Sequence, residues 1–157
     1  TTEESKPKEG VVNQPSSTRW YLAGSKPTDN MTQINDKIVT YEDNHSDCIK
    51  SAVSAPRGFG TMMKTINADE YRGKRLRMSA YVKTENVGNW AGLWMRVDGT
   101  GNKALSFDNM SNRPIKGTID WTKYEIVLNV PENSTNISYG VLLTGIGQVW
   151  ISDLQFE

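Results

Sequence analysis

Apolar and polar residues alternate with a period of two along several stretches of the chain, and this pattern constrains the fold more than any other feature. In residues 90–99 (WAGLWMRVDG) the apolar positions are Ala91, Leu93, Met95 and Val97. Successive side chains of a β-strand point to opposite faces, so one face of this stretch is predicted to meet a core. The same alternation marks residues 76–83, 123–130 and 148–156.

Shorter segments extend this pattern over the rest of the chain. Further strands are expected at 20–23, 37–41, 48–53, 61–67, 104–107 and 137–144, with loops at 28–36, 84–89 and 111–118. The run at 137–144 is largely apolar, which predicts a strand covered on both faces, and Asp153 is expected at a β-bulge. About eight to ten short strands with glycine-rich turns predict an all-β fold, an antiparallel β-sandwich or barrel.

The composition argues against several classes of protein. Lys and Arg total 18 and Asp and Glu total 18, so charge gives no reason to expect a nucleic-acid partner. No apolar run approaches the roughly 20 residues of a membrane span. The only cysteine, Cys48, excludes an intrachain disulfide and a thiolate metal cluster. The only histidine, His45, lies in a polar turn, and no phosphate or dinucleotide motif is present.

The first residues differ in character from the rest of the chain. Residues 1–17 are polar and contain Pro7, Gly10 and Pro15, which predicts a flexible leader. Residues 18–157 are then expected to form a single β-sandwich domain. The leader fits either a tether of a secreted or surface-anchored protein or the cut end of a longer chain. The tether is slightly favoured, and with it an extracellular or surface location over a cytoplasmic one.

The polar face of the 90–98 strand is the main candidate binding site. It carries Trp90, Trp94, Arg96 and Asp98, where an ordinary solvent face would carry Thr, Lys or Glu. Indole rings beside hydrogen-bonding charges suit a sugar ring. If the 76–83 strand is its neighbour, two more side chains face the same way, Tyr81 and Arg77. Alternatively this face is covered, both Trp residues belong to the core and Arg96–Asp98 is a structural ion pair.

A second polar cluster follows the strand at 104–107. It consists of Asp108, Asn109, Asn112 and Arg113. Loops often carry binding residues, and the Arg113 fork suits a carboxylate, phosphate or hydroxyl pair. Asn and Asp are also common turn formers, so the cluster is either a second binding site or an ordinary turn.

Two sets of motifs resemble known proteins. Tyr71–Gly73 before an alternating strand that ends in Lys83-Thr84, and the closing VWISDL at 149–154, resemble β-jelly-roll carbohydrate-binding modules of the galactose-binding-like kind. That resemblance implies a jelly roll, buried rings at Trp121 and Trp150, and a structural calcium near Asp153. One Asp does not supply the six to eight oxygens that Ca²⁺ takes.

A narrower resemblance covers residues 59–156. The motifs GLWMRVD at 92–98, FDNM at 107–110 and RPIKG at 113–117 are similar to a bacterial domain often labelled a transcriptional regulator or uncharacterised. It implies a ligand-sensing or interaction domain, although no helix-turn-helix motif is present.

Three functions therefore remain open. The first is a non-catalytic domain that binds carbohydrate, or another small molecule, through its aromatic and charged face. The second is a ligand-sensing domain of a regulatory protein, with a small molecule or another protein domain as partner. The third is a glycan hydrolase that uses two carboxylates, for which Asp98 and Asp108 are the candidates. The absence of a recognisable catalytic constellation favours a protein that is not an enzyme and needs no cofactor.

Overall fold

The structure is a computed structural model that describes residues 20–25, 29–42, 44–53, 56 and 58–157. The expected leader at 1–17 lies outside these residues, and the division of the chain at residue 18 stays a prediction. The strands are β1 (Tyr21–Gly24), β2 (Asn30–Tyr41), β3 (Asn44–Ser51), β4 (Phe59–Asn67), β5 (Lys74–Gly99), β6 (Ala104–Asp108), β7 (Ile115–Val130), β8 (Ser134–Thr144) and β9 (Gln148–Phe156). A short 3-10 turn, η4 (Thr100–Asn102), links β5 to β6. None of the described segments forms a helix that could cross a membrane.

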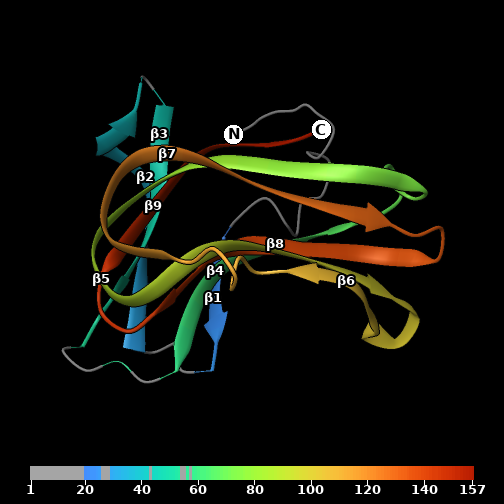
Figure 1. The fold of residues 1–157 in the computed structure, drawn as a ribbon, viewed down its shortest axis with the longest axis horizontal. Coiled ribbons are helices and arrows are strands. Elements are labelled where there is room, and N and C mark those ends of the chain that lie inside the picture. Colours follow the sequence, from blue (N-terminus) through green and yellow to red (C-terminus); the bar gives the residue numbers. More distant parts are fainter. Residues whose placement is uncertain (1–19, 26–28, 43, 54–55, 57) are drawn as a thin grey trace.

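The long strand β5 connects two layers of antiparallel strands (Figure 1). Residues 74–85 pair with β7 on one side and β9 on the other. Residues 90–99 pair with β8 and β6. The first layer therefore contains β1, β4, β8, the end of β5 and β6, and the second contains β2, β3, β9, the start of β5 and β7. The fold is the predicted all-β antiparallel jelly-roll sandwich.

One continuous strand replaces the two strands and the loop at 84–89 that the sequence predicts. Register shifts against β7 follow Val82, Thr84 and Val87, and Asn86 adopts a positive φ of 55°. These irregularities bend the strand without ending its pairing, as β-bulges do. The consequence is that residues 76–83 and 90–98 lie in different layers and are not neighbours in one sheet.

The core lies between the layers and is lined by the alternating residues. Leu93, Met95 and Val97 are fully buried, as the period-two pattern predicts. In β8 every residue from Ile137 to Leu143 is buried, so the prediction of a strand covered on both faces is confirmed. The other large, fully buried side chains of the core include Ile49, Met62, Leu76, Met78, Met110, Ile126, Leu143 and Ile151.

Asp153 lies at a β-bulge, as predicted. Its φ is 55°, and the pairing of β5 with β9 shifts register between Ser79↔Gln155 and Tyr81↔Ser152. Trp150 is buried, as expected, whereas Trp121 is only half-buried and meets Tyr41 edge-on, with ring centroids 5.7 Å apart. The core position that the resemblance implies is thus confirmed for Trp150 and wrong for Trp121.

Two predicted loops are partly strand. β2 already begins at Asn30, inside the expected loop at 28–36, and β7 begins at Ile115, inside the expected connection at 111–118. Both segments are polar and carry weak strand propensity. Pairing with β3 and with β5 holds them extended, because strand formation depends on neighbours more than on intrinsic preference.

Candidate functional site

The outer surface of the first layer, on the side away from the core, carries the main candidate side chains, and we call it the Arg96 face. In an antiparallel sheet directly paired residues point to the same side. Arg96 pairs with Ser138 on β8 and with Phe107 on β6, and Ser138 pairs with Thr65 on β4. By the same register the face includes Tyr21, Phe59, Thr61, Met63, Thr65, Asn67, Trp90, Trp94, Arg96, Asp98, Phe107, Asn136, Ser138, Leu142 and Thr144.

Trp94 lies on this face but is sealed from solvent. Its side chain is only 7% exposed, and its Nε1 donates a hydrogen bond to Thr61 Oγ1 at 2.7 Å. Thr61 Oγ1 in turn donates to the carbonyl of Val141 at 2.9 Å. The indole reaches across β8 at Gly140, its partner there, which has no side chain. The interpretation of Trp94 as an exposed contact ring is wrong, and the covered-face alternative holds for this residue.

Trp90 is half-buried at one end of the same face. The edge of its ring lies 3.5 Å from the point where a Cβ on Gly92 would stand, and the Asn109 carbonyl lies 3.1 Å from that point. Gly92 therefore leaves room for the Trp90 ring on one side and for the loop after β6 on the other. The sequence singled out the two indoles together, and only the packing separates them.

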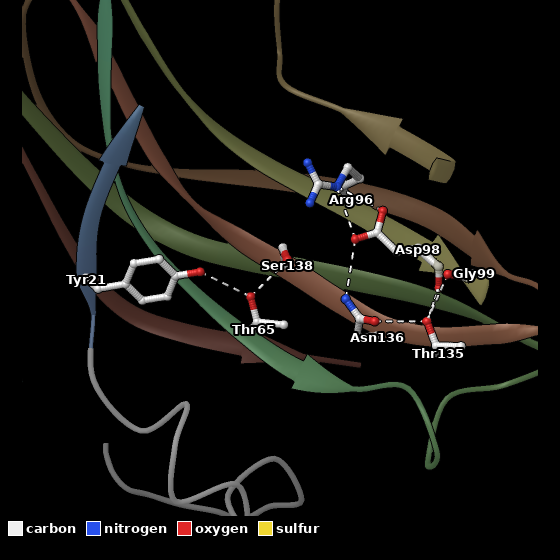
Figure 2. Close-up of polar contacts among 8 residues, drawn as sticks. All are labelled: Tyr21, Thr65, Arg96, Asp98, Gly99, Thr135, Asn136 and Ser138. Atoms are coloured by element: carbon white, nitrogen blue, oxygen red, sulfur yellow. Dashed lines mark hydrogen bonds and ion pairs between the residues drawn. The ribbon is translucent and has the colours of Figure 1, made fainter. Parts of the chain in front are cut away.

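Arg96 and Asp98 form an ion pair on the Arg96 face, as Figure 2 shows. Arg96 Nε lies 2.9 Å from Asp98 Oδ1 and donates its hydrogen bond to Oδ2 at 3.2 Å. The Asp98 side chain is 1% exposed, whereas that of Arg96 is 43% exposed. Oδ1 makes no aligned hydrogen bond with any of the described residues. The carboxylate thus anchors the guanidinium from below while the guanidinium stays accessible.

Two residues of β8 hold the carboxylate in place (Figure 2). Asn136 Nδ2 donates to Asp98 Oδ2 at 3.3 Å. The Thr135 hydroxyl lies 2.9 Å from Asn136 Oδ1 and within 3.2 Å of the carbonyls of Asp98 and Gly99. This chain of contacts fixes the orientation of the Asn136 amide, and the amide fixes the carboxylate that holds Arg96.

Hydroxyl groups and aromatic rings share the face with the guanidinium, on the strands to either side of β5. The Tyr21 hydroxyl lies 3.4 Å from Thr65 Oγ1, which lies 2.9 Å from Ser138 Oγ. Tyr21 is 46% exposed on β1 and Phe107 is 54% exposed on β6. Within the part of the chain that the structure describes, all hydrogen bonds and ion pairs of Arg96 use Nε. In Figure 2 its two terminal nitrogens point away from Asp98, free to donate to a ligand.

Tyr81 and Arg77 do not join this face. Both lie in the first half of β5 and therefore in the second layer. Tyr81 stacks on Tyr41 with ring centroids 3.9 Å apart, and Arg77 Nη1 lies 3.9 Å from Glu157 Oε1. The expectation that they neighbour Trp94 is wrong because β5 passes from one layer to the other.

The loop cluster after β6 is bonded within itself. Arg113 donates to both carboxylate oxygens of Asp108, at 2.8 and 3.3 Å, and to Asn112 Oδ1 at 2.8 Å. Asn109 Oδ1 accepts from the Ser111 backbone at 3.0 Å. Burial disfavours the charged form of Asp108, but the hydrogen bonds from Arg113 and from the Met110 backbone outweigh it, so the pKa of Asp108 is lowered. This network describes a turn whose polar groups already bond to one another.

The two carboxylates considered for catalysis each already have an arginine partner. Asp98 is buried against Arg96, and Asp108 is engaged by Arg113. On β3, Cys48 is buried and His45 is exposed. No group of three or more His, Cys, Asp or Glu side chains gathers among the described residues. The calcium near Asp153 stays a prediction.

Sequence reasoning missed most of the Arg96 face. Tyr21, Thr65, Phe107, Asn136 and Ser138 all lie in or next to strands that the sequence predicts. The alternation shows that each lies on one face of its strand. It does not show which strands pair or in which register, so it could not bring these residues beside Arg96.

Comparison with known proteins links the chain to one relative and to a group of solved structures. No family model matches the chain. The uncharacterised HTH-type transcriptional regulator YbfP of Bacillus subtilis (strain 168) is 49% identical over 139 residues. The match covers 88% of this chain and 47% of the relative, so the chain spans about half the length of that protein. The predicted resemblance to regulator-labelled bacterial proteins is thereby confirmed.

Carbohydrate-binding modules share the fold. The CBM22-1 xylan-binding domain of Paenibacillus barcinonensis Xyn10C superimposes with a TM-score of 0.60 and 12% identity, over 90% of this chain and 87% of that one. TmCBM61 in complex with β-1,4-galactotriose superimposes with a TM-score of 0.57 and 11% identity, and the match covers 96% of this chain and 99% of TmCBM61. The CBM22-1–GH10 modules of Clostridium thermocellum Xyn10B, complexed with xylohexaose, superimpose with a TM-score of 0.62 and 11% identity. That match covers 87% of this chain and 26% of the two-module chain. The resemblance to β-jelly-roll binding modules is confirmed at the level of the fold.

Proposed function

We propose that this domain binds carbohydrate without catalysis, through the Arg96 face. The observation that carries the proposal is an accessible guanidinium that is anchored by a buried carboxylate. The exposed ring of Phe107 lies at the paired position on β6, and the exposed ring of Tyr21 lies on the same face, on β1. The jelly-roll likeness to carbohydrate-binding modules supports it.

The Arg96 face offers partners for both the C–H groups and the hydroxyl groups of a sugar. Aromatic rings such as Tyr21 and Phe107 pack against the C–H groups of a pyranose. The terminal nitrogens of Arg96 donate to hydroxyl oxygens, as charge-assisted donors do. Because Asp98 holds Nε, less side-chain freedom is lost on binding, and preorganisation of this kind increases affinity. Thr65 and Asn136 add polar groups beside the guanidinium.

A saccharide titration tests the proposal. A glycan array should identify saccharides that bind, with xylohexaose and β-1,4-galactotriose included, and calorimetry should then measure the affinity. Phe107→Ala should weaken the binding up to about 10-fold, because an aromatic contact is worth roughly 0.5–1.5 kcal/mol beyond the area it buries and about 1.4 kcal/mol is a factor of ten. Its melting temperature should stay close to that of the wild type, because the ring is 54% exposed.

Val127→Ala is the matched control, because this side chain is 37% exposed on the second layer. It should bind like the wild type. Chromatography of the saccharides after incubation tests the prediction that the domain is not an enzyme. Failure of every saccharide to bind would remove the proposal.

The same face supports a second candidate function, the ligand-sensing part of a regulator. The observation that favours it is the 49% identity to half of an HTH-type transcriptional regulator. In that case the saccharide that binds this chain should change the DNA binding of YbfP, measured by a mobility shift with its own promoter region. An unchanged mobility shift at saturating saccharide would contradict the sensing role and leave carbohydrate binding intact.

A further inference from the structure

The charges on the Arg96 face point to the kind of saccharide that it takes. The face carries one guanidinium and one carboxylate, Arg96 and Asp98, and the other members named above are uncharged aromatic, hydroxyl, amide and aliphatic side chains. The ion pair at 2.9 Å cancels the formal charge of the site. The positive end is accessible, and the negative end is almost completely buried.

We propose that Asp98 is a specificity-determining residue that makes this site prefer an uncharged saccharide over one that carries a carboxylate. The inference rests on the proposed carbohydrate binding and deepens it. Asp98 acts through Arg96, since its own side chain is 1% exposed and does not reach a ligand.

The physical reason is electrostatic balance. A ligand carboxylate at the terminal nitrogens of Arg96 would be attracted by the guanidinium and repelled by Asp98 directly behind it. Both interactions fall with distance and act in a partly desolvated site, where they are stronger than in water. An isolated guanidinium would favour a carboxylate strongly, because the two groups form bidentate bonds. A neutral hydroxyl pair accepts the same donors and meets no repulsion from Asp98.

The structure also shows why the Asp98 charge stays close to Arg96. Asn136 Nδ2 donates to Oδ2 of the carboxylate, and the Thr135 hydroxyl lies beside the amide oxygen of Asn136. The remaining oxygen, Oδ1, makes no aligned hydrogen bond with the described residues and lies against Arg96 Nε. The carboxylate is thus held facing the guanidinium and cannot turn toward another donor without breaking these contacts.

The experiment compares neutral saccharides with their acidic counterparts. Oligosaccharides of galactose and galacturonic acid, and of glucose and glucuronic acid, are titrated into the wild-type chain and into Asp98→Asn. The wild type should bind the neutral member about 10-fold more tightly or better, and its affinity should change little with added NaCl because neutral ligands are not screened. In Asp98→Asn the neutral-to-acidic preference should fall about 10-fold or more, and binding of the acidic member should weaken with NaCl.

Asp120→Asn is the matched control. It changes the net charge by the same amount on β7 in the second layer, where Asp120 lies 3.3 Å from Lys83. Its preference should equal that of the wild type. A wild type that prefers acidic saccharides, or a folded Asp98→Asn with unchanged preference, overturns the inference while carbohydrate binding stands. If Asp98→Asn does not fold, the preference and salt dependence of the wild type decide the question. No binding to any neutral or acidic saccharide overturns both proposals.

Discussion

Replacement of Trp94 by alanine measures directly whether this indole is interior or contact surface. The side chain is 7% exposed and donates a 2.7 Å hydrogen bond to Thr61. An aromatic side chain buries roughly 150–250 Å², which at about 25 cal/mol per Å² corresponds to roughly 4–6 kcal/mol. Such areas are upper bounds, and measured aromatic-to-alanine substitutions in cores cost about 3–5 kcal/mol. We expect Trp94→Ala to lower the free energy of unfolding by about 3–5 kcal/mol.

Urea denaturation followed by circular dichroism measures this loss, and a thermal melt provides a second measurement. For a domain of this size each kcal/mol lowers Tm by roughly 2–4 °C, so the melt should shift by roughly 6–20 °C. Trp94→Phe keeps a ring but removes the indole N–H, and it should cost about 1–2 kcal/mol. Phe107→Ala, at an exposed ring on the same face, should cost less than about 1 kcal/mol. A loss below about 1 kcal/mol for Trp94→Ala would show that the packing argument is wrong.

Two further perturbations test other parts of the fold. Gly140→Ala should destabilise the domain by about 1–3 kcal/mol or more, measured by urea denaturation, because the new Cβ would collide with the Met62 carbonyl on β4; an unchanged midpoint would contradict this close approach of the strands. The hydrogen bond with Tyr81, assisted by burial and nearby carboxylates, raises the pKa of Tyr41 to about 12. The stability from this raised pKa is complete below about pH 10, the ordinary tyrosine value, and is lost as the pH rises through 12. Burial also raises the pKa of Tyr139, so an ultraviolet titration should show late tyrosines of which one, Tyr41, moves toward about pH 10 in Tyr81→Phe. A titration that this substitution leaves unchanged would rule out the hydrogen bond as the cause.

The pair Arg96–Asp98 shows how far the sequence led at the candidate site. The two residues are separated by one position on a predicted strand, so their side chains must share a face. The sequence therefore predicted that they lie together, and it offered two roles for them, ligand contact and structural ion pair. The structure shows an ion pair in which one partner is buried and the other accessible, so the structural role is present and the guanidinium remains available to a ligand.

Tyr81 and Phe107 show where prediction from the sequence failed, since the first is a candidate that lies elsewhere and the second is a site residue that was missed. Tyr81 can face the same way as Trp94 only if the strands at 76–83 and 90–98 are neighbours in one sheet. Here the second follows the first without a turn, as part of the same β5, so they enter different layers. Phe107 was not selected, yet its pairing with Arg96 places it beside the guanidinium. The placement of Tyr81 depends on the bend in β5, and the placement of Phe107 depends on the register between β5 and β6. The alternation of apolar and polar residues within one strand predicts neither.

The sequence by itself determined most of the strand pattern, the core-facing positions of 90–98 and the all-β antiparallel class, whereas the jelly roll was implied by the resemblance to binding modules. These follow from the period of two, which is a property of consecutive residues and needs no knowledge of distant ones. Only the tertiary structure decided which indole is sealed, which residues pair with Arg96 on the neighbouring strands and which carboxylate is buried beside its guanidinium. The physical reason is that burial and cross-strand neighbours are set by pairing between residues far apart in the chain, as Thr61 with Trp94 and Asn136 with Asp98 demonstrate.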